Sequence, residues 1–419
     1  MKQLFTAVVC IVLSIGTQAQ SLAPAQYRQD FLEFWETISR SYCYFNTKVT
    51  DWAKVKDMYL PATDTITTKA QFTVLLEKAL YELHDHHAGL NTNTNESRRL
   101  VPTNADVWAE YQKGRPVITE LRPGYGPELA GVRAGMEIVA VNNIPVEKAI
   151  QDFLPRSGSG VDDEAKSFAL RLLLAGDHVQ KRIFTLMQNG KTMDFYPDKD
   201  GMALEHICYT ALLETKIIGA TGYIRINNCL YDNDLVPAFD SVMKMMQHTK
   251  SLILDLRETP SGGNTTVART ILSWFVSKDH YYQKHEDYSE EKQFGIKRSW
   301  MEIVSPRKGK YYDKPLVILA NHWTGSIAEA IVIGFDGMHR KNTRIIGTPM
   351  ARLKGAIWTF EMPNTKIRYS IPTEKLYRND GLPREQYLPQ DNITSLLKDN
   401  INGRDVFISR ALAYLESLK

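Results

Sequence analysis

The chain has few cysteines, little net charge and no low-complexity or repeated segment. Its 419 residues include 4 cysteines, and no two of them have metal-ligand spacing. So few cysteines argue against a disulfide framework and a structural zinc site, and Cys43, Cys208 and Cys229 are expected to be buried small residues. The formal net charge is only +3, so neither nucleic acid nor an anionic membrane surface is indicated as a partner.

Long apolar runs are also lacking, apart from one at the N-terminus. This run begins after a single lysine, covers residues 4–15 and ends before small residues at Thr17 and Ala19. Such an arrangement is typical of a secretory signal peptide, and the run is shorter than the ~20 residues of a membrane span. We therefore expect residues 1–20 to be removed and the mature protein to be exported, periplasmic or extracellular, without a membrane span.

The remaining chain changes character twice. Apolar and aromatic residues first repeat at helical spacing, through about residue 90. Short alternating strands come next, and then strands alternate with helices to near the C-terminus. The last pattern indicates an α/β domain with a largely parallel sheet. We expect an N-terminal helical cap at 21–103, a β-rich domain at 104–203 and an α/β core at 204–419.

The strongest single hint of catalysis is a serine between a strand and a helix. The apolar run 315–320 ends, Ser326 follows a Thr-Gly turn, and a helical pattern begins at Ile327. A serine there exposes its hydroxyl at the sheet edge, beside the free N–H groups of the helix start. The hydroxyl can attack a carbonyl while those N–H groups hold the oxyanion. A serine before a helix is also an ordinary N-cap, so the local sequence leaves both roles open.

Paired glycines follow another apolar strand. Gly262 and Gly263 come after the run 251–256. Glycines at a strand end let the backbone approach a ligand closely and aim N–H groups at it. Seen alone, the pair is equally compatible with an ordinary turn.

Two polar segments far apart in the sequence carry titratable groups. At the end of the helical part, His84, His86 and His87 are three histidines within four residues. No further metal-ligand motif accompanies these histidines. A neutral imidazole that takes a serine proton is therefore the better functional interpretation. The turn-rich loop 380–391 contains Glu385, either a surface residue or a carboxylate that orients the base.

The β-rich domain has the spacing of a known peptide-binding module. The run Ala130-Gly-Val-x-x-Gly-Met-x-Ile-x-x-Val-Asn142 places a short helical turn, a glycine turn and a strand in succession. It resembles the PDZ domain, which binds an extended peptide as an added strand and often grips its C-terminal carboxylate. A PDZ-shaped spacer without a ligand is the alternative.

Taken in order, these motifs resemble one family over almost the whole mature chain. The helical cap ends in Asp-x-His, and after the PDZ-like insert come Asp255-Leu-Arg-x-x-Pro-x-Gly-Gly263 and Gly325-Ser-x-x-Glu329. This order resembles the C-terminal-processing (tail-specific) serine peptidases, which include the core of the tricorn protease. The resemblance implies a ClpP/crotonase-like layered α/β core, and a serine endopeptidase that acts on peptides or proteins without a metal or organic cofactor.

The resemblance also implies roles for individual residues. Ser326 matches the family's nucleophile, and the backbone N–H groups of Gly263 and Ile327 match its oxyanion hole. His87 falls where the tricorn-like branch has its base. Glu385 falls where that branch has the carboxylate that orients the base. We expect these residues to form the catalytic site.

Two alternatives are open at this stage. The family's other branch uses a lysine base, and Lys354 is the candidate here, although it lies farther from the serine than that pattern has it and needs a lowered pKa to act. The second alternative is a latent or inactive member that binds a peptide or an apolar ligand, as the retinoid-binding relatives do. A catalytic chain requires His87 and Glu385 to converge on Ser326.

Overall fold

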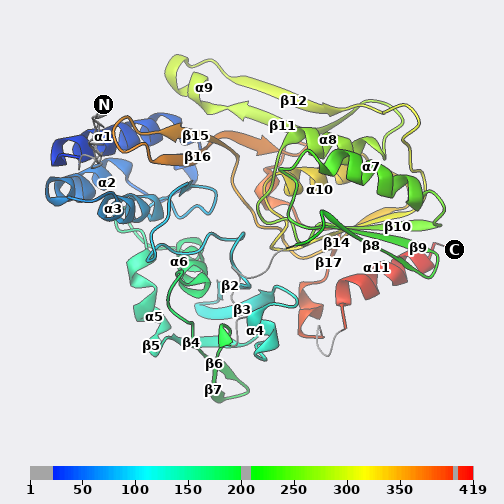
Figure 1. The fold of residues 1–419 in the computed structure, drawn as a ribbon, viewed down its shortest axis with the longest axis horizontal. Helices are drawn as coiled ribbons and strands as arrows, with labels where there is room; N and C mark the ends of the chain where they lie inside the picture. The colour runs from blue at the N-terminus through cyan, green and yellow to red at the C-terminus, as the bar shows by residue number, and fades with distance from the viewer. Residues whose placement is uncertain (1–21, 200–208, 400–403, 419) are drawn as a thin grey trace, which may run out of the picture.

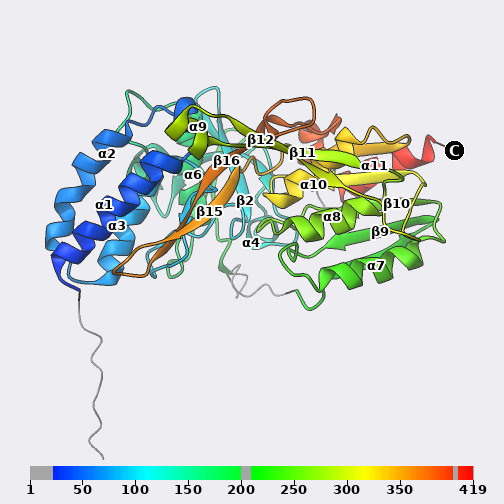
Figure 2. The same ribbon diagram turned by 90° about the horizontal axis from the view of Figure 1, so that it is seen from above.

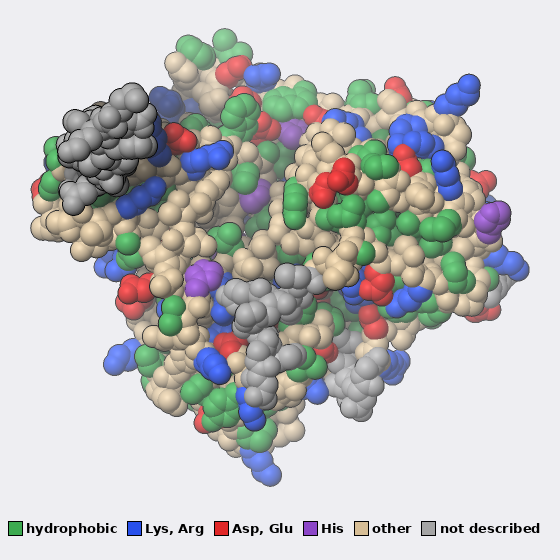
Figure 3. Space-filling model, viewed as in Figure 1, with side chains coloured by type: hydrophobic (Ala, Val, Ile, Leu, Met, Phe, Trp, Pro, Cys, Tyr) green, Lys and Arg blue, Asp and Glu red, His purple; other side chains and the backbone are tan. Residues whose placement is uncertain are grey.

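The computed structural model describes residues 22–199, 209–399 and 404–418, so the expected signal peptide and Cys208 lie outside it. Three β-sheets and the helices that cover them make up the described chain (Figure 1). On the face shown in Figure 3, acidic and basic side chains are interspersed, in keeping with the small net charge. Within the described ranges, no helix combines the length and apolar character that crossing a membrane requires.

Three α-helices form the N-terminal part: α1 (Pro24–Ser41), α2 (Trp52–Tyr59) and α3 (Lys69–Tyr81). The side chains of Asp51 and Thr68 accept N–H bonds from the first turns of α2 and α3, which fixes where these helices begin. Their apolar faces share one buried cluster with strand residues from far along the chain, such as Tyr369 and Ile371. The helices are therefore packed on β-structure and do not form a separate core.

An antiparallel sheet follows, with strand order β2-β3-β4-β6-β7 and β5 beside β4. Helix α6 shares a buried cluster with this sheet, to which Trp108, Ile138 and Phe168 belong. The elements are β2 (Val107–Gln112), β3 (Arg115–Leu121), α4 (Gly126–Leu129), β4 (Glu137–Val141), β5 (Ile144–Pro145), α5 (Val146–Ala149), α6 (Asp163–Ala175), β6 (Phe184–Gln188) and β7 (Lys191–Phe195).

The central sheet has the order β17-β14-β13-β10-β9-β8, and its strands are parallel except for β8. Leu252 and Leu254 belong to the buried cluster of α7, α8 and α10, while Ile253 belongs to the cluster of α11. Both faces are thus covered, which explains the continuous apolar strands. The elements are β8 (Leu213–Ile218), β9 (Thr221–Ile226), α7 (Leu235–Met246), β10 (Ser251–Asp255), α8 (Thr265–Ser273), β13 (Leu316–Ala320), α10 (Ile327–Gly337), β14 (Thr343–Gly347), β17 (Asp391–Asn392) and α11 (Val406–Glu416).

A third sheet connects the N-terminal helices with the central sheet, as Figure 2 shows. Its order is β1-β16-β11-β12, with β15 also paired to β16. Strand β1 brings the chain segment that follows the histidines into this sheet, because Gly89 pairs with Ser370. The elements are β1 (Gly89–Leu90), β11 (His280–Asp287), α9 (Tyr288–Phe294), β12 (Arg298–Val304), β15 (Ala356–Glu361) and β16 (Arg368–Tyr377).

Candidate active site

Ser326 sits at the turn between β13 and α10 in a strained conformation. Its backbone has φ 53° and ψ −111°. Residues other than glycine seldom adopt this conformation, and those that do cluster at functional sites. The Ser326 N–H donates to Oε2 of Glu329 at 2.9 Å, whereas the Ser326 hydroxyl makes no capping bond to the helix. Ser326 and Glu329 occupy the two positions of a capping box, but the part of the chain that the structure describes holds no side-chain hydrogen bond that would occupy the Ser326 hydroxyl.

The glycine loop after β10 lies directly against the serine. Gly262 has a φ of +66°, and a Cβ built on it would lie 2.5 Å from the Cβ of Ser326. A Cβ on Gly263 would lie 2.1 Å from the carbonyl of Leu230. Throughout the described residues, the N–H groups of Gly263 and Ile327 donate to no protein oxygen. Two free N–H donors thus flank the contact between Ser326 and Gly262, as an oxyanion hole requires.

Glu329 ties the serine turn to the segment that precedes β15. This fully buried carboxylate accepts N–H bonds from Ser326, from Arg352 at 3.0 Å and from Leu353 at 3.2 Å. Burial raises the pKa of Glu329 to about 7, although the guanidinium of Arg384 opposes the shift. In the sequence, Glu329 served only to complete the Gly-Ser-x-x-Glu motif. Its spacing from Ser326 nevertheless places it at the third position of the helix, where a glutamate side chain can accept a bond from the backbone N–H of the residue that caps the helix.

His87 is held by two hydrogen bonds beyond the end of α3. Its backbone N–H donates to Oδ1 of Asp85 at 2.9 Å, and its Nδ1 lies 2.7 Å from the carbonyl oxygen of Lys354. Burial lowers the pKa of His87 to about 4, although the bond to the Lys354 carbonyl opposes the shift. A neutral imidazole whose Nδ1–H donates to a carbonyl keeps its lone pair on Nε2, which is the form that accepts a serine proton.

The structure brings His87 and Ser326 to the same short segment of chain. Glu329 links Ser326 to residues 352–353, and the next residue, Lys354, supplies the carbonyl that His87 contacts. In the described structure, the Ser326 hydroxyl and the His87 ring share no hydrogen bond. Catalytic hydrogen bonds are often long in a free enzyme and shorten when substrate binds.

Glu385 lies in the single-turn helix Arg384–Gln386, close to this segment but not bonded to the base. Its Oε2 is buried and has no hydrogen-bond partner among the described residues, and burial raises the pKa of Glu385. Asp85 and Lys354 lie near enough to affect the Glu385 charge. The Nδ1 of His87 therefore uses the Lys354 carbonyl where the family resemblance implied the Glu385 carboxylate.

Lys354 is arranged to keep its proton. Its Nζ donates to Oε1 of Glu164 at 2.7 Å, and Lys48 donates to the same oxygen at 3.2 Å. Burial alone would lower the pKa of Lys354, but the Asp85 and Glu164 carboxylates raise it above its ordinary value. Burial and the neighbouring Lys354 instead lower the pKa of Lys48 to about 8. Lys354 contributes its carbonyl, not its amine, to the surroundings of His87.

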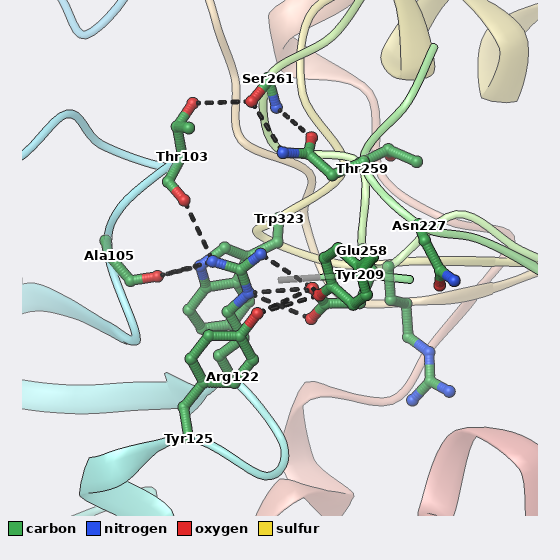
Figure 4. Close-up of polar contacts among 12 residues, drawn as sticks. Thr103, Ala105, Arg122, Tyr125, Tyr209, Asn227, Glu258, Thr259, Ser261 and Trp323 are labelled. Atoms are coloured by element: carbon green, nitrogen blue, oxygen red, sulfur yellow. Dashed lines mark hydrogen bonds and ion pairs between the residues drawn. The ribbon is translucent and has the colours of Figure 1, made fainter. Parts of the chain in front are cut away.

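A buried ion pair fastens the glycine loop to the antiparallel sheet (Figure 4). Arg122, just after β3, donates through Nη2 to Oε2 of Glu258 at 2.8 Å and through Nε to both carboxylate oxygens at 3.1 Å. Tyr125 and Tyr209 also donate to Oε2 of Glu258. The carboxylate thus accepts five hydrogen bonds from four donor groups, and Glu258 lies only four residues before Gly262.

The serine loop makes its own contact with the same region. The indole N–H of Trp323 donates to the carbonyl of Ala105 at 2.7 Å, and the N–H of Thr259 donates to the carbonyl of Trp323 at 3.2 Å. Sequence analysis missed this network, since nothing in the local pattern around Arg122 or Glu258 marks them as partners. Among the described residues, no three His, Cys, Asp or Glu side chains gather where they could hold a metal ion.

Two family models match the chain. Residues 220–391 match peptidase family S41, and residues 23–80 match the Tricorn protease C1 domain. Residues 220–391 thus form a domain of peptidase family S41. The chain is a serine-type peptidase, as its motifs predicted, and the S41 match spans the glycine loop, Ser326 and Glu385. A comparison with curated proteins gives no significant match.

Solved structures share the fold of this S41 peptidase. A photosystem II D1 C-terminal processing protease matches at 18% identity and a TM-score of 0.55, over 92% of this chain and 97% of that one. Mature CPAF matches at 15% identity and a TM-score of 0.59, over 90% and 94%. A putative peptidase from Parabacteroides merdae matches at 16% identity and a TM-score of 0.56, over 93% and 96%. The predicted mixed α/β fold is thereby confirmed.

Proposed function

We propose that this S41 peptidase is an exported endopeptidase that cleaves peptides or proteins through an acyl-enzyme on Ser326, with His87 as the base. The observation that carries the proposal is the serine turn. Ser326 is strained, its hydroxyl is not used to cap α10, and the free N–H groups of Gly263 and Ile327 lie beside it. The neutral His87 is tied to the same turn through Lys354 and Glu329.

In this mechanism His87 Nε2 takes the proton of Ser326 as the Oγ attacks the peptide carbonyl. The oxyanion accepts hydrogen bonds from the N–H groups of Gly263 and Ile327. The imidazolium then gives its proton to the leaving amine, and water repeats the sequence to release the acyl group. Asp85 holds the His87 backbone, and the nearby Glu385 carboxylate adds negative charge that favours the imidazolium.

The antiparallel sheet is proposed as the peptide-recognition part, in the manner of a PDZ domain. Its strand order, its flanking helices α4–α6 and the glycine turns at Gly131 and Gly135, both with positive φ, support this assignment. A peptide added to a strand edge gains affinity from main-chain hydrogen bonds and makes few side-chain demands.

A latent peptidase is the second candidate, and one observation favours it. The described structure has no hydrogen bond between the Ser326 hydroxyl and the His87 ring, so the two side chains must come into contact before reaction. In the first candidate substrate binding brings them together, and in the second it does not.

Cleavage of an unfolded protein tests the proposal. Reduced, alkylated casein is incubated with the mature protein and with Ser326→Ala, and the fragments are mapped by mass spectrometry. Internal fragments that wild type alone releases are expected. Casein that stays intact with folded wild-type protein would favour the latent candidate, and fragments that Ser326→Ala also releases would exclude Ser326 as the nucleophile.

A further inference from the structure

Arg384 opens the single-turn helix that also carries Glu385, and it is buried beside the serine turn. The residue is 1% exposed, and its Nη2 lies 3.7 Å from Oε2 of Glu329, the oxygen that accepts the Ser326 N–H. Within the described ranges of the chain, Glu329 makes no other ion pair. Arg384 therefore joins the loop of Glu385 to the serine turn, a contact that the proposed mechanism does not use.

The same nitrogen of Arg384 also holds the segment of chain that faces His87. Its Nη2 donates to the carbonyl oxygens of Leu353 at 2.8 Å and Gly355 at 3.1 Å. The carbonyl oxygen between them, that of Lys354, lies 2.7 Å from Nδ1 of His87. Each peptide group is planar, so bonds to the peptide groups on both sides leave the Lys354 carbonyl little freedom to rotate away from the imidazole.

The third sheet fixes the orientation of the guanidinium. Nη1 of Arg384 donates to Oε1 of Gln283 on β11 at 3.4 Å. The amide nitrogen of Gln283 lies 2.9 Å from Nε2 of His285, whose Nδ1 lies 2.8 Å from Oε2 of Glu374. A chain of polar contacts thus connects β16 and β11 to Arg384. The guanidinium is held independently of the segment 353–355 that it contacts.

The charge of Arg384 acts on three titratable groups of the site. Burial raises the pKa values of Glu329 and Glu385, and the guanidinium opposes both shifts. Burial lowers the pKa of His87, and Arg384 adds to that effect. A positive charge at this place favours ionised carboxylates and a neutral imidazole, and a neutral imidazole is the form in which a base begins the reaction.

We propose that Arg384 is a positioning residue of this peptidase, which aims the Lys354 carbonyl at Nδ1 of His87 and so presents Nε2 to Ser326. The inference rests on the proposed function, because it takes His87 as the base. Arginine suits this role, since its planar fork donates several bonds in fixed directions, whereas a lysine ammonium is a point charge on a flexible stem. Without the fork, two buried carbonyls lose a donor and the segment that faces His87 loosens.

Arg384→Lys and Arg384→Gln test this role, and Arg340→Met is the matched control. Lysine keeps a charge beside Glu329 without the fork, and glutamine removes the charge as well. Arg340 makes the same kind of clamp, because its Nη2 donates to the carbonyls of Tyr312 at 2.6 Å and Lys314 at 2.9 Å. It follows the end of α10 that is farther from the serine turn, so its loss weakens the fold without touching the site.

The first readout is the His87 ring itself, which needs no activity. Histidine labelled with 15N is observed by NMR in Ser326→Ala, and the His87 signal is assigned by its loss in His87→Gln. A slowly exchanging Nδ1–H proton is expected with Arg384 intact and in Arg340→Met. In Arg384→Lys this proton should shift upfield and exchange about tenfold faster, the effect of weakening one hydrogen bond, and in Arg384→Gln it should be lost.

Two NMR results would overturn the inference. One is an unchanged Nδ1–H signal in folded Arg384→Lys, and the other is a protein with Arg384 intact that shows no protected Nδ1–H proton on His87. Melting temperatures establish which variants are folded. If Arg384→Gln does not fold, Arg384→Lys alone decides, because it keeps the charge that the buried carboxylate of Glu329 requires.

The second readout is the kinetics of wild type and the same variants on a quenched fluorescent peptide taken from the casein fragments. A misaligned base slows the reaction without weakening substrate binding, so kcat should fall about tenfold in Arg384→Lys and about 100-fold in Arg384→Gln, with KM changed by less than about twofold. Arg340→Met should keep its kcat. An active wild type whose kcat Arg384→Lys leaves unchanged rejects this inference alone. A wild type that neither cleaves casein nor reacts with a fluorophosphonate rejects the proposed function, and the NMR comparison still decides what Arg384 holds.

Discussion

At the scale of single residues, the space around Ser326 leaves no room for a side chain on Gly262. The Cβ of Gly262→Ala would meet the Cβ of Ser326 at 2.5 Å, so the variant should displace the nucleophile. We expect peptidase activity to fall by roughly 100-fold or more, the effect of misplacing one catalytic group. Gly190→Ala is the matched control, because Gly190 has the same kind of positive φ but nothing within 4 Å of the added Cβ. Similar activity losses in both variants would show that backbone strain, not contact with Ser326, matters.

The pH dependence of the reaction identifies the base. A base must be unprotonated, and burial lowers the pKa of His87 to about 4. Activity should therefore rise with pH through an inflection well below the ordinary histidine value of about 6.5. The measurement is kcat/KM against pH for wild type and for Glu329→Gln, which separates any inflection of Glu329, whose pKa burial raises to about 7. An inflection above pH 10 would instead assign the proton transfer to Lys354, since its pKa is raised.

At this scale the sequence was informative wherever chemistry fixes the residue type. Ser326, the paired glycines and His87 stand in local motifs that predict their proposed roles, and the structure places the glycine loop against the serine. The partner of the His87 ring was not predictable, because a backbone carbonyl leaves no mark in the sequence.

At the scale of elements, one ion pair joins the strand β3 to the loop that carries Gly262. Glu258→Gln leaves the buried Arg122 without its charge partner, and breaking such a pair costs about 3–5 kcal/mol. We expect the free energy of unfolding, measured by urea titration, to fall by that order. Replacing both residues, as Arg122→Met with Glu258→Leu, should cost less than Glu258→Gln.

The exposed pair of Arg115 and Glu137 provides the control for this prediction. Their nitrogen and oxygen lie 3.6 Å apart, with Arg115 largely in solvent, so Glu137→Gln should change stability by no more than about 1 kcal/mol. If Glu258→Gln costs no more than Glu137→Gln, the pair shown in Figure 4 does not hold the loop.

Element prediction succeeded for the central sheet and failed for the third sheet. Strands β9, β10 and β13 are apolar runs separated by helices, a pattern set by local sequence. Segment 277–307, to which the sequence analysis assigned no element, contains β11, α9 and β12. Its strands carry charged and aromatic residues without a clear alternation of apolar and polar side chains. Strand β11 pairs with β16, some ninety residues away. Pairing over such distances depends on the whole chain and not on local propensity.

At the scale of the whole molecule, the N-terminal helices complete a core to which the C-terminal half contributes. Tyr369 and Ile371 on β16 are buried with α1 and α3, and Gly89 pairs with Ser370. A chain shortened to begin at Asn91 should therefore expose this apolar surface, lose solubility and fail to react with active-site probes. The comparison is a chain that begins at Leu22, which should remain folded and reactive. Normal folding of the shorter chain, judged by its melting temperature, would contradict this account.

The central claim is that Ser326 is activated by His87 and not by Lys354. The most direct measurement is labelling by a fluorophosphonate probe of four folded proteins: wild type, Ser326→Ala, His87→Gln and Lys354→Met. The last variant removes the amine and keeps the carbonyl that contacts His87. We expect wild type and Lys354→Met to be labelled, and Ser326→Ala and His87→Gln to be unreactive. Labelling that survives in His87→Gln and disappears in Lys354→Met would contradict the account.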